Sequence, residues 1–95
     1  MAQFVMMCFD KPASLALRQA TREAHLAYMA SRQDMIRLGG PMLDDAGDMK
    51  GSLIIVEAAD IETVRAFNAA DPYTLAGLFE RVEIHGWRQT VGPRT

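Results

Sequence analysis

The sequence has almost no cysteine, no excess of basic charge and no long apolar run. Cys8 is the only cysteine, so no disulfide can form within the chain, and we expect a reduced, cytoplasmic setting. The longest strongly apolar segments, Phe4–Phe9 and Leu53–Val56, fall far short of the ~18 residues that a membrane span needs. The first residues also lack the basic region and long apolar segment of a secretory signal. We therefore expect no membrane partner.

Charge and spacing also argue against nucleic acid, metal and resident cofactors. Ten Lys/Arg oppose twelve Asp/Glu, which gives a net charge of −2 and no broad basic surface. One cysteine and two distant histidines, His25 and His85, cannot form a recognisable zinc site. Residues 39–41 lack the lysine and the following helix of a phosphate-binding loop. Lys11 and Lys50 lie in predicted turns, where neither is placed for a Schiff base.

The length and composition are those of one small globular domain. The chain has 95 residues, of which 49% are hydrophobic and 23% charged. We therefore assign residues 1–95 to a single domain, with residues 91–95 as a tail. A domain of this size buries only about 60–65% of its unfolded surface, so a partner subunit would extend its modest core.

Hydrophobic periodicity and breaker residues predict a mixed order of strands and helices. The expected elements are a strand at 3–9, a helix of about eighteen residues capped by Ser14, a strand at 35–38 stopped by residues 39–41, a strand at 51–57, a helix capped by Asp60, a helical turn from Asp71 to Gly77, and a strand at 79–87. This β-α-β-β-α-β order is the α+β, ferredoxin-like plan. Its central strands are the first and third, which are the two that are apolar on both faces here.

In this plan the helices cover one face of the sheet, and the other face needs a cover. A second copy of the same sheet, in a two-fold symmetric homodimer, is the simplest one. We therefore predict a homodimer.

His25 is the leading candidate for chemistry because it lies near the middle of the apolar face of the first helix. An imidazole titrates near neutral pH and can act as base or acid. A core histidine bonded to a carbonyl is the competing interpretation. Arg18 and Arg22 share its strip and could hold an anionic group of a ligand, or could instead reach the helix edge or pair with carboxylates across a dimer. Tyr28, one turn further, could line a pocket or fill the core.

Asp71 is the second candidate. Asp71-Pro72 is a typical helix start, and a capping role alone would explain it. A cap uses only part of the carboxylate, however, so the remaining lone pairs could accept a hydrogen bond from His25. Such a contact would fix the tautomer of the ring and stabilise the imidazolium.

Several short motifs, in order along positions 3–88, resemble the YciI-like (YCII-related) family. They are Arg22-Glu23-Ala24-His25-Leu26, Arg37-Leu38-Gly39-Gly40-Pro41, Gly51-Ser52, Ala70-Asp71-Pro72-Tyr73, Ala76-Gly77 and Val82-Glu83-Ile84. The resemblance implies a ferredoxin-like fold of the dimeric α/β barrel type, with a catalytic His–Asp dyad at His25 and Asp71 and a cleft arginine at Arg22. Family members usually end the last strand with Pro-Phe or Pro-Trp, whereas this chain has Gly86-Trp87.

One branch of that family removes chloride from a chlorinated hydroxyhydroquinone, which makes proton transfer on a small polar ring a plausible reaction class. The hypothesis is therefore an enzyme that uses His25 and Asp71 for general acid–base catalysis on a small anionic or phenolic molecule, which Arg22, Arg18 and Tyr28 help to bind. Two alternatives stay open: a non-catalytic module that binds a small metabolite in the same cleft, and an assembly subunit.

Overall fold

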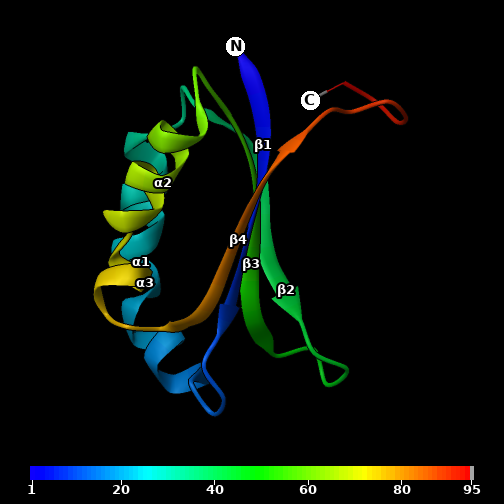
Figure 1. The fold of residues 1–95 in the computed structure, drawn as a ribbon. Helices are drawn as coiled ribbons and strands as arrows, with labels where there is room; N and C mark the ends of the chain where they lie inside the picture. The colour runs from blue at the N-terminus through cyan, green and yellow to red at the C-terminus, as the bar shows by residue number, and fades with distance from the viewer. Residues whose placement is uncertain (95) are drawn as a thin grey trace.

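The computed structural model describes residues 1–94 and contains four strands and three helices (Figure 1). The elements are β1 (Ala2–Asp10), α1 (Leu15–Ser31), β2 (Ile36–Leu43), β3 (Met49–Ala58), α2 (Ile61–Ala69), α3 (Pro72–Leu75) and β4 (Phe79–Trp87). None of the helices in this part of the chain is long and apolar enough to cross a membrane.

The four strands form one antiparallel sheet in the order β2-β3-β1-β4, which confirms the ferredoxin-like plan. The two strands that are apolar on both faces, β1 and β3, occupy the centre as predicted. In the register, Met6 of β1 lies opposite Ile54 of β3 on one side and Ile84 of β4 on the other. Residues paired directly across neighbouring strands point to the same face of a sheet, so Met6, Ile54 and Ile84 lie in one layer.

All three helices cover that one face, and the opposite face of the sheet is open (Figure 1). The core lies between the two layers. Its buried side chains come from both layers: Phe4, Met6, Ile54 and Val56 from the sheet and Val64 and Phe67 from α2, among others. Burial of this apolar surface is the main favourable contribution to folding.

β2 is longer than the sequence pattern predicts, because Gly39, Gly40 and Pro41 do not stop it. The strand runs on to Leu43, and Pro41 lies opposite Ser52 of β3. An edge strand tolerates proline because one side of its backbone needs no partner in the sheet. β2 is such an edge strand.

The helix caps agree with the predictions at two of three positions. Asp60 Oδ1 accepts a hydrogen bond from the Thr63 amide at 2.9 Å, and Asp71 Oδ1 accepts one from the Tyr73 amide at 2.9 Å. Ser14 does occupy the N-cap position of α1, but its hydroxyl donates to the Pro12 carbonyl instead of accepting from the helix. Gly77, with a φ of +74°, follows α3 as expected for a helix terminator.

The close packing of β1 against β3 generates a prediction about Gly51. A Cβ atom at this position would overlap the Cys8 carbonyl oxygen and would lie 2.7 Å from Met42 Cε. Gly51→Ala should therefore lower the free energy of unfolding by about 1–3 kcal/mol, measured by urea denaturation. Gly86→Ala is the matched control, because no heavy atom lies within 4 Å of a Cβ atom there. Equal unfolding midpoints for the two variants would contradict this account.

Candidate active site

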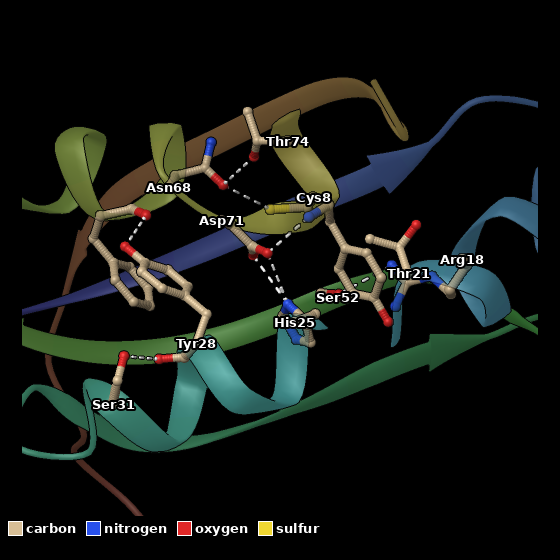
Figure 2. Close-up of polar contacts among 12 residues, drawn as sticks. Cys8, Arg18, Thr21, His25, Tyr28, Ser31, Ser52, Asn68, Asp71 and Thr74 are labelled. Carbon is tan, nitrogen blue, oxygen red and sulfur yellow. Dashed lines mark hydrogen bonds and ion pairs between the residues drawn. The ribbon is translucent and has the colours of Figure 1, made fainter. Parts of the chain in front are cut away.

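His25 and Asp71 meet beneath helix α1, although 46 positions separate them in the sequence. His25 projects from the third turn of α1, and Asp71 immediately precedes α3. His25 Nδ1 lies 2.9 Å from Asp71 Oδ1 and 3.1 Å from Oδ2, and both residues are buried. Figure 2 shows the His25 ring turned toward this carboxylate. The contact that the sequence left open is therefore confirmed.

The carboxylate determines which nitrogen of His25 carries the hydrogen. A carboxylate only accepts hydrogen bonds, so Nδ1 is the donor, and the neutral ring presents the lone pair of Nε2 on its other edge. Asp71 Oδ1 accepts from the Tyr73 amide at the same time as from His25. The cap that fixes the start of α3 thus also fixes the partner of the imidazole.

Tyr73 completes the immediate surroundings of His25, although no sequence pattern predicted a role for it at the site. Its ring stacks on the imidazole with 4.0 Å between centroids and 18° between planes. The Arg18 Cζ atom lies 4.5 Å from the centroid of the same ring. Arg18 and His25 are seven residues apart, which is ~10.5 Å along a helix, so the tyrosine ring fits between them. Its position two residues after Asp71 was the only available signal.

Arg18 is buried in an ion pair within the chain, which corrects two of the expectations for it. Its Nε atom donates to Asp10 Oδ2 at 2.7 Å, and its Nη2 atom donates to Asp10 Oδ1 at 2.8 Å and to Ser52 Oγ at 3.0 Å. Arg18 therefore neither reaches the helix edge nor depends on a carboxylate of a second subunit. Burial disfavours its charge, but the hydrogen bonds and charge of Asp10 outweigh this and raise the pKa of Arg18.

A cavity of about 190 Å³ lies between α1 and strands β2 and β3. Its polar lining comes from Arg18, Arg22, His25, Ser52 and Tyr73. Its remaining lining comes from apolar residues and from residues 39–41, with Leu26, Met29, Met49 and Ile54 among the contributors. An apolar cavity of about 150 Å³ holds one benzene molecule, so this space fits a small substituted ring.

The structure brings four of the five predicted site residues to this cavity or its wall. His25, Arg18 and Arg22 line it, and Asp71 is hydrogen-bonded to His25. Tyr28 is not among the lining residues. Its hydroxyl donates to the Phe67 carbonyl at 2.8 Å, and its ring stacks on that of Phe67, so it packs against the core.

A wider hollow of about 730 Å³ lies between the N-terminal strand and the C-terminal tail. Arg37, Glu57, Trp87 and Arg88 contribute to its walls. It contains neither His25 nor Asp71. The smaller cavity is therefore the candidate active site.

Cys8 lies close to this site but is held in an unreactive state. Burial and the nearby charge of Asp71 raise the pKa of the Cys8 thiol to about 12. Its Sγ atom lies 3.7 Å from Asn68 Oδ1. A thiolate is the reactive form of cysteine, so Cys8 is a packed core residue and not a nucleophile.

Comparison with known proteins places these residues in a family. The YCII-related domain matches residues 2–88. Protein YciI of Escherichia coli O6:H1 is 35% identical, and the alignment covers 90% of this chain and 96% of that protein. An uncharacterized protein of Haemophilus influenzae is 29% identical over the same shares of the two chains.

Among solved structures, a similar one is 5-chloro-2-hydroxyhydroquinone dehydrochlorinase (TftG) from Burkholderia phenoliruptrix AC1100, in complex with 2,5-dihydroxybenzoquinone. It superposes with a TM-score of 0.86 and 36% identity, over 93% of this chain and 95% of that one. An antibiotic biosynthesis monooxygenase superposes with a TM-score of 0.56 at 13% identity, over 96% of this chain and all of that one. This second likeness shows the fold alone.

The burial of Cys8 predicts its reactivity. A pKa near 12, against 9.0 for an ordinary cysteine, leaves about a thousandfold less thiolate at pH 8. In the native protein, the disulfide reagent DTNB should therefore not react with Cys8 within the time that a free thiol needs for completion. In urea the same protein should release one equivalent of thionitrobenzoate. Rapid reaction of the native thiol would contradict the assignment.

Proposed function

The chain belongs to the YCII-related domain family, and on this basis we propose that it is a small-molecule enzyme that uses His25 and Asp71 for general acid–base catalysis. The observation that carries the proposal is the 2.9 Å hydrogen bond between His25 Nδ1 and a buried Asp71 at the wall of a cavity. Because Asp71 occupies Nδ1, the proton is exchanged at Nε2. Asp71 then stabilises the imidazolium that forms.

The proposed substrate is a small anionic or phenolic molecule, and most simply a hydroxylated six-membered ring. The cavity volume of about 190 Å³ and its largely apolar lining suit one such ring. Arg22 supplies a guanidinium that binds or polarises an oxygen of the ligand. The related dehydrochlorinase, by its name, acts on a ring of this type.

For a chlorinated hydroxyhydroquinone the proton balance is simple. His25 Nε2 takes the proton of a ring hydroxyl, and the resulting oxyanion pushes electron density into the ring. The ring carbon that carries chlorine takes up a proton, which makes this carbon tetrahedral. A second hydroxyl then loses its proton, chloride leaves with the electron pair of its carbon bond, and the product is a hydroxybenzoquinone. Loss of hydrogen chloride in this way needs no external oxidant. General acid–base catalysis contributes on the order of 10²–10⁴-fold, which is enough for a reaction that already proceeds in solution.

His25→Asn tests the proposal, because asparagine keeps a hydrogen-bonding side chain of similar size but cannot exchange a proton. We expect the rate of chloride release from 5-chloro-2-hydroxyhydroquinone to fall by at least about 100-fold. Binding of 2,5-dihydroxybenzoquinone, followed by its visible absorbance, should change only a few-fold. His85→Asn is the matched control, because His85 is exposed on β4 beside Glu83 and should leave both measurements unchanged.

Two outcomes would overturn this function. If the wild-type protein binds hydroxylated rings but converts none of them, the cavity belongs to a non-catalytic binding module. If His25→Asn converts them at the wild-type rate, the proton is moved by another group.

We also propose that the protein is a homodimer whose subunits meet through the open faces of their sheets. Strands β1 and β3 present Val5, Met7 and Leu53 on this face, and each is only half-buried within one chain. Leu38 of β2 lies on the same face and is 43% exposed. A contiguous apolar surface of this kind is typical of an interface.

Sedimentation equilibrium tests the dimer. We expect twice the 10.5 kDa of one chain at micromolar concentration. Leu38→Glu should shift the protein toward the monomer, because it would bury a charge in the interface. Leu75→Glu, on α3 at a leucine that is 74% exposed, should not. A monomeric wild type would refute this assembly.

A further inference from the structure

The buried Tyr73 side chain has its hydroxyl beside the Arg18 guanidinium, which is a hydrogen-bond donor, and the hydroxyl has no acceptor for its own hydrogen among residues 1–94. Tyr73 is 1% exposed and lines the cavity. Its ring is engaged by His25, Arg18 and Phe79, and its backbone amide by Asp71. The hydroxyl donates no hydrogen bond to residues 1–94, and no polar side-chain atom in that range is both sealed from solvent and unpaired. The remaining accessible surface of the hydroxyl therefore faces the cavity.

A phenylalanine would provide all the packing that the Tyr73 ring provides. A buried tyrosine hydroxyl normally finds a hydrogen-bond partner, because its desolvation is otherwise uncompensated. The matched case in this chain is Tyr28, whose hydroxyl is paired with the Phe67 carbonyl. The partner of the Tyr73 hydroxyl is thus to be sought in the cavity.

The groups around this hydroxyl are hydrogen-bond donors. Arg18 uses Nε and Nη2 for Asp10 and Ser52, so its Nη1 atom is not engaged by either residue. Arg22 lines the cavity and forms no salt bridge with residues 1–94. Both nearby carboxylates are already occupied, Asp10 by Arg18 and Asp71 by His25. Guanidinium groups donate and never accept, so neither arginine can accept the phenolic hydrogen, and a ligand oxygen in the cavity can.

The phenol also stays in its donating form. Burial raises the pKa of Tyr73, and the positive charges of Arg18 and Arg22 oppose this rise without cancelling it. The hydroxyl therefore keeps its hydrogen at neutral pH. A neutral phenol between two guanidinium groups is a good donor to an anionic oxygen, because hydrogen bonds to charged acceptors are the strong ones.

We propose that the Tyr73 hydroxyl donates a hydrogen bond to an anionic oxygen of the bound ligand, beside Arg18 and Arg22. This inference rests on the proposed function and adds a ligand-contacting residue to it. The ligand then carries a phenolate, enolate or carboxylate oxygen at the donors, while His25 exchanges a proton at another position of the same molecule. Where negative charge develops on that oxygen during the reaction, Tyr73 stabilises it together with the two arginines.

Tyr73→Phe removes the hydroxyl and leaves the ring stack and the amide in place. With 2,5-dihydroxybenzoquinone as the probe at neutral pH, where it is an anion, we expect the dissociation constant to rise about 10- to 100-fold. Tyr28→Phe is the matched control: it also removes one hydroxyl, but one that faces Phe67 and not the cavity. Its dissociation constant should stay within twofold of the wild-type value. Thermal unfolding of both variants checks that each is folded.

A second measurement does not depend on the stability of Tyr73→Phe. In the Tyr28→Phe variant, Tyr73 is the only tyrosine left, because the sequence has two. Incorporation of 3-fluorotyrosine then gives a single fluorine NMR signal, which should shift when the probe is added. A signal that does not move at saturating probe would overturn the proposed contact.

The outcomes separate this inference from the function on which it rests. If the wild type binds the probe and Tyr73→Phe binds it equally well, Tyr73 is a packing residue and only the further inference fails. If the wild type does not bind the probe at millimolar concentration, the donors do not form an anion site, and both the inference and the proposed ligand class fail. Turnover by the wild type and by His25→Asn tests the acid–base mechanism independently of either result.

Discussion

Helix α1 is held in place by a buried ion pair and by a buried hydrogen bond between histidine and carboxylate, and the geometry of the site depends on them. Arg18 pairs with Asp10 and His25 pairs with Asp71, so the two buried residues of the helix are both polar. Removing one partner of a buried pair typically costs 3–5 kcal/mol, because the other charge is left unpaired. Both contacts are directional: Arg18–Asp10 joins α1 to β1, and His25–Asp71 joins α1 to the start of α3.

The cavity follows from this mode of attachment. A helix that packed through an apolar stripe would bring its leucines onto the sheet and fill the space beneath it. Here Leu17 and Leu26 keep much of their surface exposed, and the closest backbone neighbour of α1 is the short helix α3. The space that remains is lined by apolar side chains of the sheet and by the polar groups that hold the helix. The two residues of α1 that position the helix, Arg18 and His25, thus also line the cavity.

The short segment from Asp71 to Tyr73 joins local structure to chemistry. Asp71 caps α3, fixes the tautomer of His25 and contributes to the inert state of Cys8. Tyr73 fixes the plane of the imidazole and fills the space between it and Arg18. A fold of this kind is shared by proteins with different activities, so the chemistry has to be argued from side chains such as these.

The sequence by itself determined the elements and their order, because hydrophobic period, caps and breakers act over a few residues. It identified the central strands, the Asp60 and Asp71 caps and the two residues of the dyad. It placed the end of β2 too early at Gly39–Pro41, because the tolerance of an edge strand for proline depends on which strand lies beside it. Only the tertiary structure decided that Arg18 belongs to Asp10, that Tyr73 stacks on His25 and that Tyr28 turns to Phe67. Those contacts join separate elements, and no local spacing encodes the distance between side chains that only the packed sheet and helices bring together.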